Sequence, residues 1–175
     1  MGWTLMIHGG AGAMARGRLS EADERAGRAG LAAALAAGGA VLEAQGSALD
    51  AVEAAVRVLE DDPAFNAGRG SVFTWDGTIE CDAAIMDGRD REAGAVAGVS
   101  ATRNPVSLAR AVMTESAHVL LSAAGADAFS VEHGQAQETH LGFADVINAQ
   151  HVGHAAVRRD QDHALGQVGP TGLVA

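Results

Sequence analysis

The fold class of this chain is decided by residues 47–77, SALDAVEAAVRVLEDDPAFNAGRGSVFTWDG. Within this stretch a predicted helix is followed by a Gly-rich turn. Ser47 with Asp50 is a helix start signal, and apolar residues then recur at helical spacing until Pro63, which ends the helix. That apolar face consists of Leu49, Val52, Val56 and Leu59. The Gly-rich stretch FNAGRGSV, residues 65–72, follows directly, so we expect a helix, a tight turn and then the start of a sheet.

Turn signals divide the next part of the chain into short strands. Asp76-Gly77 predicts a hairpin between strands at 71–74 and 78–86. Asp87-Gly88 predicts a second turn before a small-residue strand, AGAVAGV, at 93–99, where Gly allows another layer to approach closely. We expect these three strands to be antiparallel neighbours.

Helical patterns surround these strands in the sequence. They cover residues 20–46, residues 104–115 and, in part, residues 119–128. The apolar segment 3–7 predicts a buried strand that stops at a Gly-rich loop. Strands with helices packed on them predict an α+β layered fold.

Composition limits the size and the partners of the protein. The chain has 175 residues, which is enough for one domain with a core. Hydrophobic residues make up 48% but aromatic residues only 3%, so the core must pack through small side chains. The net charge of −10 argues against a nucleic-acid partner. All 12 basic residues are Arg, which excludes a Walker-type phosphate loop and a Schiff-base lysine.

Cysteine content and apolar runs predict the compartment. Cys81 is the only cysteine, so no internal disulfide can form, and a reducing cytoplasm is the expected location. The first ten residues are a short apolar strand followed by Gly and do not resemble a targeting segment. No apolar run approaches the roughly 18 residues of a membrane span. We expect a soluble protein that does not associate with membranes.

Several motifs point to chemistry only weakly. HGGAG at 8–12 is similar to an esterase oxyanion loop, but the chain has no G-x-S-x-G nucleophile elbow. Gly68-x-Gly70 lacks the third Gly of a dinucleotide fingerprint and precedes a strand. His151 and His154 have the spacing of metal ligands, yet a solvated polar segment is the better interpretation.

Acidic and thiol groups near the hairpin were the remaining candidates. Glu80, Asp82 and Asp87 are carboxylates that acid and base catalysis uses, but charged ends of an exposed hairpin are the favoured interpretation. Cys81 stands between two of these acids, which would raise the pKa of its thiol, so a structural thiol on a strand is favoured over a nucleophile.

A series of longer motifs is more specific than any of these. In chain order they are IHGGAGA (7–13), the quoted stretch 47–77, IECDAAIMDG (79–88), AGAVAGVS (93–100), RNPVSLARAVM (103–113) and HVLLSAAGADAFS (118–130). Together they resemble the plant-type L-asparaginase and isoaspartyl peptidase family. The resemblance implies an αββα sandwich of the N-terminal nucleophile hydrolase type, one half of which this chain supplies and a β subunit completes.

The resemblance also implies an activity and its partners. Family members cut themselves into an α and a β chain, and the new N-terminal Thr of the β chain attacks L-asparagine or β-aspartyl peptides. This chain would be the α-subunit portion of such a hydrolase, in an (αβ)2 assembly whose β subunit carries the substrate pocket. The alternatives are an aspartylglucosaminidase-like hydrolase, or a truncated or frameshifted non-catalytic homologue that self-associates.

Site residues carry over position by position. The matching loop of the family binds a structural sodium ion through backbone carbonyl oxygens, and no organic cofactor is implied. The corresponding residues are Leu59, Glu60, Asp62, Phe65, Ala67 and Arg69. Asn66 matches an Asn that helps to position the nucleophile, and Gly9 with Gly10 matches a segment that moves during self-cleavage.

The resemblance assigns residues 1–130 to the α-subunit core and 169–175 to a processing-site-like terminus, and the weak apolar periodicity of residues 131–168 predicts a variable polar linker between them. GPTGLVA at that terminus departs from the family pattern, in which Gly is followed by the nucleophile Thr. One alignment places Pro170, which has no hydroxyl, at the nucleophile position. The other makes Thr171 the nucleophile, so that the bond to be cut follows Pro170 instead of Gly169.

Overall fold

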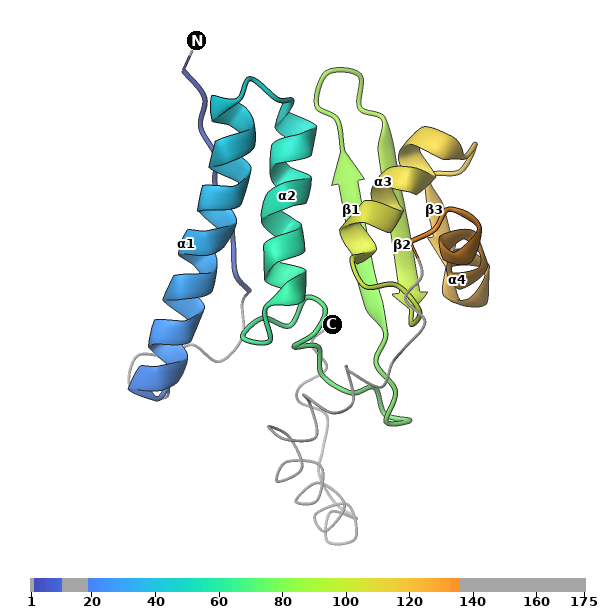
Figure 1. The fold of residues 1–175 in the computed structure, drawn as a ribbon. Coiled ribbons are helices and arrows are strands. Elements are labelled where there is room, and N and C mark those ends of the chain that lie inside the picture. The colour runs from blue at the N-terminus through green and yellow to red at the C-terminus, as the bar shows by residue number, and fades with distance from the viewer. Residues whose placement is uncertain (1, 11–18, 136–175) are drawn as a thin grey trace, which may run out of the picture. The chain divides into compact units, whose positions relative to one another are not determined.

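The computed structural model describes residues 2–10 and 19–135, and its helices and strands form the predicted α+β fold (Figure 1). In chain order they are α1 (Glu21–Glu43), α2 (Ala48–Asp61), β1 (Cys81–Met86), β2 (Ala93–Val99), α3 (Pro105–Glu115), β3 (Leu120–Ser122) and α4 (Ala123–Glu132). The predicted terminus 169–175 and most of the predicted linker 131–168 lie outside the described residues. None of the described helices is long and apolar enough to cross a bilayer.

The three strands form one mixed sheet in the order β1-β2-β3. β1 and β2 are antiparallel, as predicted, with Ala84 opposite Ala95. β3 is parallel to β2, with Leu120 opposite Ala95. Two of the three predicted antiparallel strands, 78–86 and 93–99, therefore correspond to β1 and β2, whereas β3 was not predicted as a strand.

The predicted strand at 71–74 is absent because its backbone has other partners. The N–H of Ser71 donates to the carbonyl of Gly68 (3.0 Å), and the N–H of Val72 donates to Oδ1 of Asn66 (3.0 Å). The predicted turn does form, since the N–H of Thr74 donates to the carbonyl of Thr78 (2.8 Å). It closes a short loop and does not continue into a hairpin.

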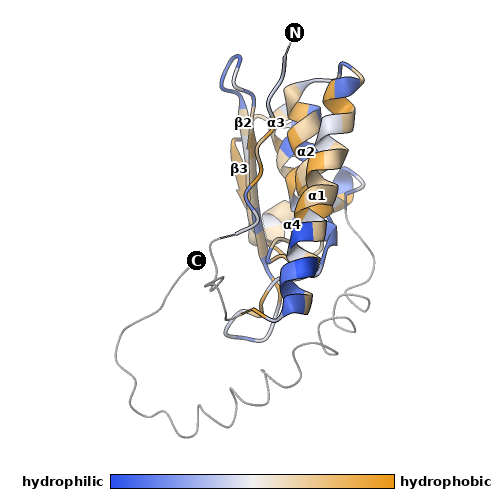
Figure 2. Ribbon diagram, turned by 90° about the vertical axis from the view of Figure 1, so that its left-hand side faces the viewer, coloured by the Kyte–Doolittle hydropathy of each residue, from blue (hydrophilic) through white to orange (hydrophobic). Residues whose placement is uncertain are grey.

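Helices cover one face of the sheet (Figure 2). α3 packs on β1 and β2, and α4 contributes to the same core. The buried residues of this core are Cys81, Ile85, Val96, Val99, Val106, Leu108, Ala109, Val112 and Ala126. In the described part of the chain, no helix or strand covers the opposite face, on which Met86 and Leu120 are 60% and 56% exposed.

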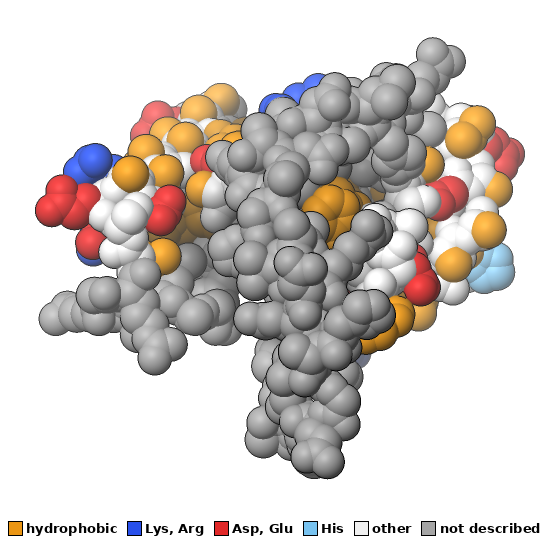
Figure 3. Space-filling view, turned by 90° about the horizontal axis from the view of Figure 1, so that it is seen from below, with side chains coloured by type: hydrophobic (Ala, Val, Ile, Leu, Met, Phe, Trp, Pro, Cys, Tyr) orange, Lys and Arg blue, Asp and Glu red, His pale blue; other side chains and the backbone are white. Residues whose placement is uncertain are grey.

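Small side chains bring α1 and α2 together, as the composition predicts. Ala34, Ala51 and Ala55 are at most 1% exposed in this layer. Charged residues gather on the first turns of α1 (Figure 3), where Arg25 and Arg28 form ion pairs with the glutamates one turn before them.

The predicted buried strand at 3–7 is wrong for the described structure. This segment is not paired with any of the three strands, and Trp3 and Met6 are 49% and 85% exposed. It lies along α1 instead, with Leu5 near Gly38 and Trp3 near Gly39. Its backbone therefore has no ladder partner within the described residues.

The helix starts were predicted well. Ser20 and Ser47 are the N-caps of α1 and α2, and each hydroxyl accepts a hydrogen bond from the backbone N–H three residues later. Ser47 and Asp50 form the complete reciprocal capping box. Asn104 precedes α3 as expected, but its side chain does not cap the helix.

We expect Ser47→Ala to lower the free energy of unfolding by about 1 kcal/mol, because α2 loses the acceptor for one of its first N–H groups. Ser47→Thr retains the hydroxyl and should stay close to wild type. Urea denaturation of the three proteins measures the difference. Equal midpoints for the Ala and Thr variants would contradict a stabilising role for this cap.

Candidate functional site

The predicted cation loop begins in the last turn of α2. Leu59 and Glu60 belong to that helix and Asp62 is its C-cap, while Phe65, Ala67 and Arg69 lie in the turns that follow. The loop closes on the helix because the N–H of Arg69 donates to the carbonyl of Glu60 (2.8 Å). The helix end thus gains a hydrogen-bond partner that it would otherwise lack.

Two of the six predicted carbonyl oxygens already accept backbone hydrogen bonds. Besides Glu60, the carbonyl of Asp62 accepts from the N–H of Phe65 (3.2 Å). A carbonyl oxygen has two lone pairs, so each retains one for a further partner. In the described residues, no group of three or more His, Cys, Asp or Glu side chains could hold a metal ion. Any cation at this loop therefore depends on the carbonyl groups.

Asn66 lies on the exposed side of the same loop. Its Oδ1 accepts from the N–H of Val72, and this hydrogen bond fixes the direction of the amide group. The Nδ2 group is not used in that bond and remains as a donor. The structure thus orients Asn66, while its role toward a nucleophile stays a prediction.

The predicted Gly9–Gly10 segment lies next to this loop. The ring of Phe65 is close to Gly9, and the N–H of Gly10 donates to Nδ1 of His8 (3.3 Å). The structure therefore brings together two segments that are more than 50 residues apart in the sequence. Gly169, Pro170 and Thr171 lie outside the described residues.

The carboxyl group of Glu60 has a role that the sequence motifs, which point only to its backbone carbonyl, do not predict. The residue is 2% exposed, and its Oε1 accepts from the N–H of Val106 (2.8 Å) in the first turn of α3. Within the described structure Oε2 is buried without a partner, and burial raises the pKa of this carboxyl to about 7. Glu60 lies four residues after Val56 on the apolar face of α2, and that spacing was the available signal.

The hairpin candidates do not form a catalytic group. Cys81 lies on a strand, β1, as predicted; it is buried there, and burial raises the pKa of its thiol. Asp82 accepts from the N–H of Gly98 (2.7 Å), and Asp87 pairs with Arg89 beyond the end of β1. Asp82 thus binds the neighbouring strand β2, and Asp87 binds within the turn between β1 and β2.

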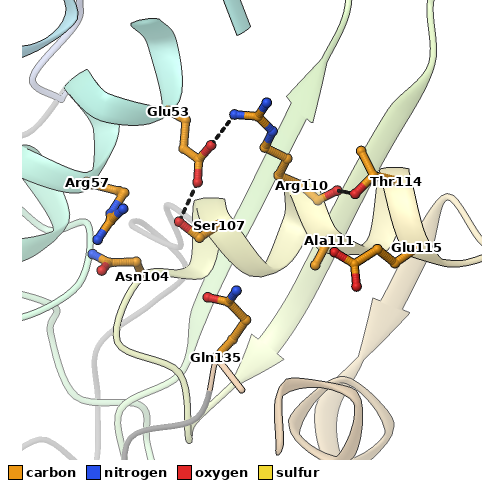
Figure 4. A pocket seen from close by; sticks show the side chains of 9 residues that line it. All are labelled: Glu53, Arg57, Asn104, Ser107, Arg110, Ala111, Thr114, Glu115 and Gln135. Atoms are coloured by element: carbon orange, nitrogen blue, oxygen red, sulfur yellow. Dashed lines mark hydrogen bonds and ion pairs between the residues drawn. The ribbon is translucent and has the colours of Figure 1, made fainter. Parts of the chain in front are cut away.

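A cavity of about 300 Å³ lies between α2 and α3 (Figure 4). Its lining is polar, but several of these groups already bind one another. Glu53 accepts from the hydroxyl of Ser107 (2.6 Å) and pairs with Arg110, and the hydroxyl of Thr114 donates to the carbonyl of Arg110 (3.1 Å). None of the predicted site residues lines it. These polar contacts link α2 to α3.

Comparison with known proteins decides the family. A family model described as Asparaginase matches residues 1–168. The chain belongs to the asparaginase family. The resemblance seen in the sequence motifs is therefore confirmed.

Individual relatives of this asparaginase-family chain carry two related names. An isoaspartyl peptidase of Escherichia coli strain K12 is 42% identical over 180 residues, which cover 97% of this chain and 56% of the relative. A plant-type L-asparaginase of Pyrococcus abyssi is 50% identical over 128 residues, or 72% of this chain and 40% of the relative. An isoaspartyl peptidase/L-asparaginase of Rattus norvegicus is 48% identical over 131 residues, which cover 74% of this chain and 38% of the relative. The chain thus spans about half the length, or less, of these curated relatives.

Proposed function

We propose that this chain is the α-subunit portion of an isoaspartyl peptidase and L-asparaginase. The observation that carries the proposal is its similarity to relatives with these names, which extends over 97% of the chain in the bacterial isoaspartyl peptidase. L-Asparagine and β-aspartyl peptides are the proposed substrates.

The proposed partner is a β subunit that completes an αββα sandwich, in an (αβ)2 assembly. The sheet face that no described helix or strand covers supports this partner, since it presents mostly small and apolar side chains, as an interface between two sheets requires. Its small and apolar residues are Ala84, Met86, Ala93, Ala95, Ala97 and Leu120, and the polar residues Asp82 and Ser122 lie on the same face. Segment 3–7, which pairs with no strand of the described residues, supports it too, because strands of a partner could supply hydrogen bonds to its backbone.

The proposed reaction uses Thr171 as an N-terminal nucleophile after self-cleavage. Its α-amine accepts the proton of its hydroxyl, and the hydroxyl oxygen attacks the side-chain amide carbon of the substrate. The C–N bond then breaks, and ammonia or the amine of a β-aspartyl peptide leaves with the proton. Water hydrolyses the ester, which releases aspartate and restores the hydroxyl. Asn66 would orient the nucleophile through its Nδ2, and the Gly9–Gly10 segment would move during self-cleavage.

A structural sodium ion is proposed at the loop after α2, and no organic cofactor. Backbone carbonyl oxygens of Leu59, Glu60, Asp62, Phe65, Ala67 and Arg69 would hold it, and oxygen donors are those that hard cations prefer. A location in the cytoplasm remains a prediction from the single cysteine.

The test uses the chain together with the polypeptide encoded directly downstream of residue 175. We expect intact mass to show a second polypeptide that starts at Thr171, and we expect aspartate release from L-asparagine and β-aspartyl dipeptides. Thr171→Ala should abolish both, and Thr171→Ser, which keeps the hydroxyl, should retain part of each.

Other outcomes separate the alternatives. Preferred hydrolysis of N-acetylglucosaminyl-asparagine would replace the proposal with an aspartylglucosaminidase-like specificity. One uncleaved species that self-associates and releases no aspartate would overturn the enzymatic proposal and favour the non-catalytic homologue.

A further inference from the structure

The ring of Phe65 is in contact with two glycines from different parts of the chain. The side chain is 3% exposed. A Cβ placed on Gly9 would lie 3.0 Å from Cε1 of Phe65, and one placed on Gly30 of α1 would lie 2.5 Å from Cε2. The ring therefore occupies the space that both glycines leave open, between α1 and the Gly9–Gly10 segment.

Neighbouring contacts fix the loop on α1 at the same place. Asp62 also packs against Gly30, where an added Cβ would overlap Oδ2 of Asp62. Its Oδ1 accepts from the N–H of Ala64 (2.9 Å), so the side chain holds the start of the loop as well. Ile7 and Leu31 pack against the cluster of buried residues that contains Phe65. One compact group thus joins α1, the loop and the N-terminal segment.

The two glycines of the N-terminal segment differ in how closely described residues surround them. Gly9 is held between Phe65 and Leu31, since a Cβ there would lie 3.0 Å from Cδ2 of Leu31 as well. Gly10 has φ of 123°, and a Cβ there would meet no atom within 4 Å. The segment therefore has a closely packed residue followed by one whose positive φ favours glycine.

We propose that Phe65 is a positioning residue that transmits the conformation of the loop at 59–70 to the Gly9–Gly10 segment. Gly30 of α1 is the position against which the ring packs. That this role of Phe65 matters for self-cleavage rests on the proposed function. The physical reason is that a packed ring with two rotatable bonds cannot absorb a shift of the loop, so the shift passes to the neighbouring backbone. Sequence patterns identified Phe65 only through its carbonyl oxygen, whereas this role belongs to its ring.

The first test follows the backbone amide signals of the full ¹⁵N-labelled chain by NMR while sodium chloride replaces choline chloride at constant ionic strength. In wild type we expect the signals of Gly68 and Gly70 to move, and those of Gly9 and Gly10 to move with the same sodium dependence. In Phe65→Leu the loop signals should still move, and the response of Gly9 and Gly10 should be lost.

Phe129→Leu is the matched control, because it makes the same change in the separate core beside α4. It should leave the response of Gly9 and Gly10 intact. An undiminished response of Gly9 and Gly10 in Phe65→Leu would overturn the proposal. If sodium moves no loop signal in wild type, the sodium site is rejected, and the second test alone decides the role of Phe65.

The second test needs no cation. Gly30→Ala should displace the ring and shift the signals of Gly9 and Gly10, whereas Gly27→Ala, one turn earlier with no atom within 4 Å, should not. In the Phe65→Leu background the effect of Gly30→Ala on Gly9 and Gly10 should disappear. Shifts in the loop without shifts at Gly9 and Gly10 would overturn the proposal. If Gly30→Ala does not fold, Gly9→Ala replaces it, and its shifts of the loop signals should disappear in the Phe65→Leu background.

Discussion

Gly94→Val is expected to lower the free energy of unfolding by at least about 3 kcal/mol, because β2 touches the backbone of α3 at this position. A Cβ on Gly94 would overlap the carbonyl oxygen of Ala109 and lie 2.6 Å from the backbone nitrogen of Met113. Helix backbone cannot move aside as a flexible side chain can. α3 would have to separate from the sheet and expose Leu108 and Val112, which are fully buried.

The experiment compares unfolding midpoints in urea for wild type, Gly94→Ala and Gly94→Val. The Ala variant should lie between the other two, because the methyl group already overlaps Ala109. Gly88→Val is the control, since a Cβ on Gly88 would meet no atom within 4 Å. If Gly94→Val unfolds at the same urea concentration as Gly88→Val, the close contact between β2 and α3 is wrong.

Signals that depend on neighbours in the sequence predicted their elements correctly. The capping residues Ser20 and Ser47 placed two helix starts, and Pro63 placed the end of α2. The small-residue strand at 93–99 was predicted with its bounds and with a close layer against it, which Gly94 confirms. These features are set by one or two turns of chain, so the local pattern is sufficient.

Strand pairing could not be predicted in the same way because it depends on distant partners. Residues 120–122 were assigned to a partly helical stretch, but they pair with β2 and form β3, which begins more than 20 residues after β2. Segment 3–7 has strand composition and still has no strand partner within the described residues. In both cases the composition was compatible with a strand, and the available hydrogen-bond partner decided the outcome.

In the candidate site, too, the sequence predicted some features and could not predict those that depend on distant residues. The motif match identified the loop at 59–70 and the Gly9–Gly10 segment, and the structure places them side by side. The motif match did not identify the packing of the Phe65 ring against Gly30, or the hydrogen bond between the carboxyl of Glu60 and the start of α3. Both depend on residues far apart in sequence, and no spacing rule for a single helix or strand predicts them.

The pH dependence of stability should change in Glu60→Gln. Burial raises the pKa of this carboxyl from 4.5 to about 7 in the folded chain, so the folded state holds the proton more tightly than the unfolded state. Below pH 4.5 both states are protonated and the shift has no effect. As the pH rises from 4.5 to 7, the unfolded state loses the proton first and becomes relatively more stable. Above pH 7 the full penalty of about 3 kcal/mol applies.

Glu60→Gln cannot titrate at this position, and its amide oxygen can still accept from the N–H of Val106. We therefore expect the variant to gain about 3 kcal/mol over wild type between pH 4.5 and pH 8, measured by urea denaturation in choline chloride without sodium. Glu60→Leu should lack the same pH dependence but be less stable than the Gln variant at every pH, because Val106 loses its acceptor. Parallel curves for wild type and Glu60→Gln would show that this carboxyl is not desolvated, and that the end of α2 is open to water.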